Sequence, residues 1–116
     1  MNVLVQGSKQ FSDYQVFMRA MGVALGNVGD DDEFVVYSIG PAKVNSFATE
    51  FLNLSERNLK ARGIKTKLHK VPHSWGLDKV ADMDYVAYLC TPNEKGEPAI
   101  ISFAEIAERP NAIFRF

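Results

Sequence analysis

The sequence has one cysteine, no long hydrophobic run and no marked excess of either charge. Cys90 has no partner for a disulfide within the chain, which is typical of a reducing compartment, so we expect a cytoplasmic protein. No apolar run approaches the roughly 20 residues that span a bilayer, and no signal-peptide pattern is visible. The formal net charge of −1 gives no reason to expect nucleic-acid binding through overall charge.

The motifs of common metal and nucleotide sites are also missing. His69 and His73 have no cysteine partners at zinc spacing, so we expect no metal site. For these histidines, a surface or hydrogen-bonded structural role is favoured over a catalytic one. Neither the G-x-G-x-x-G fingerprint nor the Walker A pattern occurs, and we expect no cofactor.

The residues that are present predict one globular α/β domain over 1–116. Hydrophobic residues make up 47% of the chain, enough for a core in a domain of this length. Apolar runs predict strands, and stretches with helical spacing predict helices. The expected strands cover 2–6, 34–39, 64–71, 85–90 and 112–116, and the helices 14–26, 43–62, 77–83 and 98–109, with a turn at 72–76. This alternation favours a mostly parallel five-stranded sheet in a Rossmann-like three-layer sandwich.

Two charged segments are expected away from any site. Residues 64–71 alternate in polarity, which indicates an edge strand carrying a basic stripe of Lys65, Lys67 and Lys70. The stripe either protects the edge or contacts an acidic partner or nucleic acid, and edge protection is favoured. The acidic run 30–33 is expected in an exposed loop at the far end of the sheet.

Ligands of such folds bind at the carboxyl ends of the strands, which directs attention to the loops 7–11, 40–45, 72–76 and 91–98. Two of these loops share one pattern, in which a glycine after a buried strand precedes a small residue, a lysine and a helix start. The pattern predicts a phosphate held between two helix N-termini, whereas a plain turn is the alternative for the first loop. The phosphate-binding candidates are Gly7, Ser8, Lys9, Gly40, Ala42, Lys43, Asn45 and Ser46.

Other side chains are candidates for contact with the rest of a ligand. Phe11, Trp75 and Thr91 are candidates for the base or the sugar, although Trp75 would serve equally well to close an edge of the core. Cys90 is expected to be a small buried hydrophobic residue, because no matched base is evident for a reactive thiol. No catalytic residue is predicted.

Three ordered motifs resemble small members of the SLOG superfamily, the Rossmann-like relatives of DNA-processing protein A and the Lonely-guy hydrolases. "VLVQGSKQFSDYQVFMRAM" looks like the G-S-R-x-F-x-D opening of that family, and "IGPAKVNSFATEF" is similar to its G-G-A-x-G-x-D-x-x-A segment. "KVPHSW" resembles the segment that ends in P-A-x-W after the third strand. The resemblance covers residues 2–76, and the last third matches only in pattern.

The chain departs from that family at informative positions. Lys9 replaces an arginine, Pro41 and Val44 replace glycines, and Asn45 replaces an acid. Proline has no N–H to donate, and lysine lacks the bidentate fork of arginine. The P-G-G-x-G-T-x-x-E signature of the hydrolases is absent. The resemblance therefore implies a ligand pocket and does not carry over hydrolysis.

Together these features predict a protein that binds a nucleotide or a nucleotide-derived phosphorylated ligand. The resemblance implies a sensor, sequestering protein or accessory factor of bacteria or phages, and a homo-oligomer that is most simply a dimer. One alternative is a non-catalytic protein-interaction or regulatory module on a decayed scaffold. A nucleoside-monophosphate N-glycosidase is a further, less favoured alternative. Neither a membrane nor a nucleic acid is an expected partner.

Overall fold

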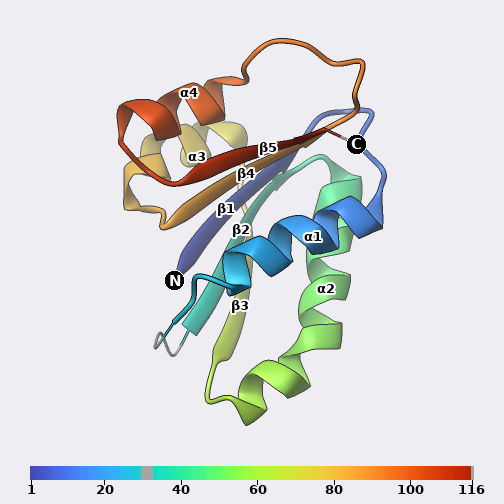
Figure 1. Cartoon of the computed structure of the whole chain (residues 1–116), viewed down its shortest axis with the longest axis vertical. Helices are drawn as coiled ribbons and strands as arrows, with labels where there is room; N and C mark the ends of the chain where they lie inside the picture. The colour runs from blue at the N-terminus through green and yellow to red at the C-terminus, as the bar shows by residue number, and fades with distance from the viewer. Residues whose placement is uncertain (30–32, 116) are drawn as a thin grey trace.

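Five parallel strands form one sheet in the order β3-β2-β1-β4-β5 (Figure 1). The structure is a computed structural model that describes residues 1–29 and 33–115. The strands are β1 (Asn2–Gly7), β2 (Glu33–Gly40), β3 (Lys65–Lys70), β4 (Tyr85–Cys90) and β5 (Asn111–Arg115). The predicted α/β fold, a Rossmann-like three-layer sandwich, is confirmed, with β3 at the predicted edge.

Helices cover both faces of the sheet (Figure 1). Helices α1 (Tyr14–Leu25) and α2 (Ala42–Ala61) lie on one face, and α3 (His73–Lys79), the short 3-10 helix η1 (Val80–Asp82) and α4 (Ala99–Ile106) lie on the other. Successive strand residues point to opposite faces, so Val3 and Val5 pack in the first layer while Leu4 packs in the second. Among residues 1–29 and 33–115, no helix combines the length and the apolar character needed to cross a membrane.

Local signals in the sequence mark the start of α1 and the end of α2. The carboxylate of Asp13 accepts hydrogen bonds from the backbone N–H groups of Gln15 and Val16, as an N-cap does. Gly63 follows α2 with a φ of +79°, the left-handed conformation that terminates many helices. The backbone N–H of Ile64 then returns to the carbonyl of Leu59 at 2.8 Å.

The turn predicted at 72–76 is wrong beyond Pro72, because α3 already begins at His73. Tertiary packing explains the difference. A Cβ on Gly76 would lie 2.6 Å from Cδ1 of Ile39, so a larger residue here would force the Ile39 side chain to shift. Glycine and tryptophan are weak helix formers, so the composition of this segment alone does not favour a helix. Helix α4 is also shorter than predicted, since it ends at Ile106 instead of Arg109.

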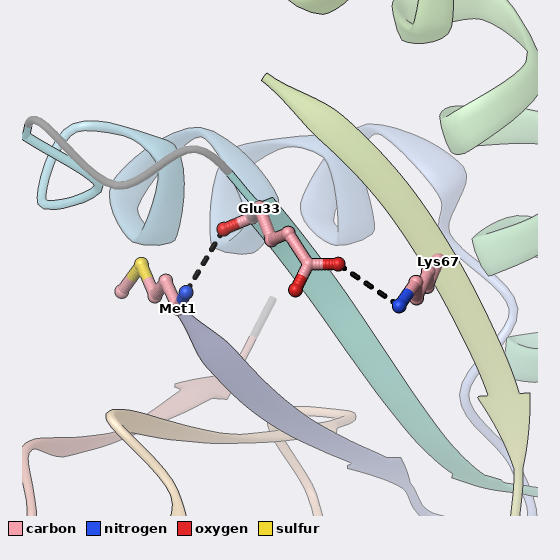
Figure 2. Close-up of polar contacts among 3 residues, drawn as sticks. All are labelled: Met1, Glu33 and Lys67. Atoms are coloured by element: carbon pink, nitrogen blue, oxygen red, sulfur yellow. Dashed lines mark hydrogen bonds and ion pairs between the residues drawn. The ribbon is translucent and has the colours of Figure 1, made fainter.

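At the far end of the sheet, Glu33 lies inside β2 and not in the predicted acidic loop, of which residues 30–32 fall outside the described part of the chain. Figure 2 shows its two contacts: its carbonyl accepts from the amino group of Met1 at 2.9 Å, and its carboxylate pairs with Lys67 at 2.9 Å. The hydrogen bond with Lys67 lowers the pKa of Glu33. One lysine of the basic stripe therefore has an acidic partner on β2.

Candidate functional site

Along the chain, β2 and β3 are added on one side of β1, and β4 and β5 are then added on the other side, so the strand order reverses at β1. In open parallel sheets this is where the loops separate and ligands bind. Gly7 is in register with Leu89, and the N–H of Ser8 donates to the carbonyl of Leu89 at 2.8 Å. This pairing brings the loop after β1 beside the loop after β4, although they are far apart in sequence (Figure 1).

Three hydrogen-bond donors from these two loops converge on one carboxylate oxygen. The hydroxyl of Ser8 donates to Oε2 of Glu94 at 2.7 Å, the backbone N–H of Thr91 donates to it at 2.7 Å, and the Thr91 hydroxyl at 3.2 Å. Ser8 is only 8% exposed. We call the Ser8 hydroxyl and the Thr91 amide and hydroxyl the anion cradle.

The cradle favours a negative charge. The hydrogen bond from Ser8, followed by the one from the Thr91 backbone, lowers the pKa of the Glu94 carboxyl from its ordinary value of 4.5. Donors that point at an oxygen stabilise its charged form over its protonated form. The three donors therefore stabilise the charged form of the chain's own Glu94 carboxylate.

A cavity of about 160 Å³ lies beside the cradle at the ends of β4 and β5. Arg115 donates from Nη2 to the carbonyl of Gly96 at 3.1 Å, which ties the end of β5 to the loop after β4. Cys90 is buried as predicted, and burial raises the pKa of its thiol, which disfavours the nucleophilic thiolate. The lining residues are Tyr88, Cys90, Glu94, Lys95, Gly96, Glu97, Pro98 and Arg115.

One unpartnered acceptor lies on the same face of the sheet as this cavity. Oε1 of Gln6 is buried without a hydrogen-bond partner. Gln6 is in register with Tyr88, which lines the cavity, and parallel partners in register point to the same face. Buried polar atoms are normally satisfied, but Gln6 is not among the residues that line the cavity.

At the junction of β1 with β2, two of the predicted clamp residues contact residues outside the predicted clamp. A Cβ on Gly7 would lie 2.5 Å from Cγ2 of Val44, so this glycine permits close packing of β1 on the start of α2. Oδ1 of Asn45 accepts from the hydroxyl of Ser38 at 2.6 Å. Gly40 has a φ of +107°, which glycine adopts without strain.

The remaining predicted site residues divide into exposed and buried positions. Lys9, Ala42, Lys43 and Ser46 are exposed, and Nζ of Lys43 lies 5.7 Å from the ring centroid of Phe47. Phe11 is 2% exposed and packs edge to face on Phe47, so its ring faces the core. The predicted roles of these residues in ligand binding stay predictions.

Trp75 of α3 belongs to an aromatic group with Tyr37 of β2 and His69 of β3. Its ring stacks on Tyr37 with a centroid distance of 4.8 Å, and His69 stacks on Tyr37 at 5.1 Å. The sequence reasoning missed Tyr37. The register of β2 with β3 places Tyr37 directly beside His69, and this pairing was visible only once the strand order was known.

Glu94 is the other residue that the sequence reasoning missed. Its signal was the T-x-x-E spacing of Thr91 and Glu94, in which a glutamate reaches back to the first N–H as in a capping box. That spacing explains the contacts with Thr91. The contact with Ser8, which is 86 residues away, needs the tertiary structure.

Comparisons with protein-family models, with curated proteins and with solved structures gave no significant match. Within residues 1–29 and 33–115, no group of three or more histidine, cysteine or acidic side chains is arranged to hold a metal ion. The resemblance to the SLOG superfamily therefore stays a prediction that rests on the three motifs.

Proposed function

We propose that this chain binds a nucleotide or a nucleotide-derived phosphorylated ligand at the carboxyl ends of β1 and β4. One observation carries the proposal: three donors from two distant loops converge on a single anionic oxygen. A phosphate oxygen accepts from hydroxyl and amide donors in the same way as a carboxylate oxygen.

The position of the anion cradle in the sheet also supports ligand binding. The cradle lies at the reversal of strand order, where open α/β sheets bind their ligands. Lys9 directly follows Ser8 and is exposed, so its ammonium group is available to a phosphate on the cradle. An exposed positive charge of this kind strengthens anion binding most at low ionic strength, where salt screens it least.

Aromatic side chains support a ligand with a flat ring. Trp75 is half-buried and His69 is exposed, and both stack on Tyr37 of β2, the strand next to β1. Bases stack on aromatic rings with little dependence on sequence. A phosphate on the cradle would suit a sensor or sequestering protein, the role that the SLOG resemblance implies.

A thermal-shift series tests the proposal with inorganic phosphate, ribose 5-phosphate, AMP, ADP and adenosine. A ligand at ten times its Kd stabilises the folded state by about 1.4 kcal/mol. That raises the Tm of a domain of this size by roughly 5 °C. We expect this shift for at least one phosphorylated compound and a smaller one for adenosine. If no phosphorylated compound raises the Tm, the proposal is wrong.

Two alanine variants locate the site. Ser8→Ala removes a donor of the cradle, and we expect it to reduce the shift with the best ligand. Ser46→Ala removes an exposed hydroxyl of the predicted clamp on the β2 side, and we expect the full shift to remain. The opposite result would move the phosphate to the junction of β1 and β2.

A further inference from the structure

The anion cradle already holds an anion, because Glu94 accepts all three of its hydrogen bonds. A phosphate cannot use the same donors while the carboxylate remains. Glu94 lies on the loop after β4 and is half-buried, so rotation of its side chain toward solvent requires no change in the sheet.

The cavity beside the cradle is too small for a ligand by itself. Its volume is about 160 Å³, whereas pockets for small ligands are typically about 300–1,000 Å³. Glu94 is common to both places, since its carboxylate sits on Ser8 and Thr91 and the residue also lines the cavity. Withdrawal of this side chain would join the cradle to the cavity.

We propose that a phosphorylated ligand binds by displacing the Glu94 carboxylate from the cradle, and that its body then occupies the cavity between β4, β5 and residues 91–98. Glu94 is thus an internal competitor of the ligand's phosphate. This inference rests on the proposed function, and it moves the ligand from the β1–β2 side, where the sequence predicted it, to the β1–β4 side.

The chemistry of the joined space indicates the class of ligand. Arg115 and Lys95 line the cavity and offer positive charge to a further anionic or polar group. The carboxylate of Glu97 lines the same cavity and would accept from a donor, such as a sugar hydroxyl or the amino group of a base. These groups fit a small phosphate monoester with hydroxyl or amino substituents, of which a nucleoside monophosphate or a sugar phosphate is the simplest form.

An internal competitor lowers the apparent affinity by the fraction of molecules in which the cradle is free. If the carboxylate occupies the cradle in nine molecules of ten, removal of its charge tightens phosphate binding by about tenfold. Glu94→Gln keeps the size of the side chain and removes the charge, while Glu94→Ala removes the side chain from the cradle altogether.

Isothermal titration with inorganic phosphate and with AMP tests this on the full chain. We expect both Glu94 variants to bind about tenfold more tightly than the unmodified protein. Glu50→Gln is the control, because Glu50 is exposed on α2 and belongs neither to the cradle nor to the residues that line the cavity. It should change the affinity by less than about twofold, the effect of general charge removal at a screened surface.

The outcomes separate the two proposals. If the unmodified protein binds AMP and the Glu94 variants bind no more tightly, displacement is wrong and the proposed function stands. If Glu50→Gln tightens binding as much as Glu94→Gln, general electrostatics explains the gain and displacement is again wrong. If no form binds phosphate or AMP while thermal melts show all of them folded, both proposals are wrong.

A measurement on the unmodified protein gives independent information. The contacts with Ser8 and Thr91 hold the pKa of Glu94 low, so its release by a ligand should return that pKa toward 4.5. Carboxyl NMR titration with and without AMP measures this change. An unchanged pKa of Glu94 in the saturated complex would overturn displacement.

Discussion

Strand β1 has a neighbour on each side, and the two junctions at its carboxyl end differ in what their side chains contact. Toward β2, Gly7 packs on Val44, and Asn45 binds Ser38. Toward β4, Ser8 and Thr91 hold a charged carboxylate beside a cavity. The first junction is satisfied by packing and a neutral hydrogen bond, whereas the second is satisfied by the carboxylate of Glu94.

The comparison teaches that a glycine after a strand does not by itself indicate a phosphate. The loops after β1 and β2 share a glycine, a small residue and a lysine. What distinguishes Ser8 from its counterpart Ala42 is the neighbouring loop after β4, which supplies Thr91 and Glu94. The predictions below test whether the first junction is structural and the second binds the ligand.

The largest effect is expected from Gly7→Ala. The added Cβ would lie 2.5 Å from Cγ2 of Val44, and overpacking of this kind costs about 1–3 kcal/mol of folding free energy. Denaturant unfolding measures it. Gly22→Ala in α1 is the control, since a Cβ there meets nothing within 4 Å and should stabilise the helix by up to about 1 kcal/mol. Partial recovery in Gly7→Ala with Val44→Ala would confirm the contact, and a neutral Gly7→Ala would refute it.

Asn45→Ala should come next in size. It leaves the hydroxyl of Ser38, which is 0% exposed, without its acceptor, and such a buried unsatisfied group costs about 1–3 kcal/mol. The double variant with Ser38→Ala should be more stable than Asn45→Ala alone, because no polar group is then left unpaired. We expect unchanged affinity for AMP. A large loss of affinity with normal stability would instead place the phosphate at this junction.

Ser8→Ala should change the pH dependence of stability. The folded-state pKa of Glu94 is lowered, so its contribution is fully present above the ordinary value of 4.5 and is lost as the pH falls through the folded-state pKa. Removal of the Ser8 hydroxyl takes away the largest cause of that shift. The difference in unfolding free energy between the two proteins should therefore be present at neutral pH and should shrink at acidic pH. A difference that is constant with pH would show that Ser8 contributes only through packing.

The smallest effect is expected from Lys43→Ala. Lys43 is exposed, and its ammonium group lies over Phe47, a contact worth about 0.5–1 kcal/mol at such a site. Thermal melts should show a small loss of stability, and titration with AMP should show an unchanged Kd. A tenfold weaker Kd would make Lys43 a phosphate ligand and would reverse the comparison of the two junctions.

Much of the fold followed from local patterns, and the exceptions have identifiable causes. The strand 85–90 was readable because burial on both faces leaves a signature in a few adjacent residues. The helix at His73–Gly76 was predicted as a turn, because the packing of Gly76 against Ile39, a residue of another element, cannot be seen in the local sequence. The aromatic group of Tyr37, His69 and Trp75 was likewise not predicted, because the register of β2 with β3 is not visible in the sequence.

By itself, the sequence determined the alternation of strands and helices, the parallel sheet and the ends of its best-marked helices. These depend on periodicity and on capping residues, which act over a few positions. Only the tertiary structure decided which loops meet. The hydrogen bond between Ser8 and Glu94 joins residues 86 positions apart, and it exists because β4 pairs with β1. No local pattern specifies that pairing, so the anion cradle became visible only with the order of the strands.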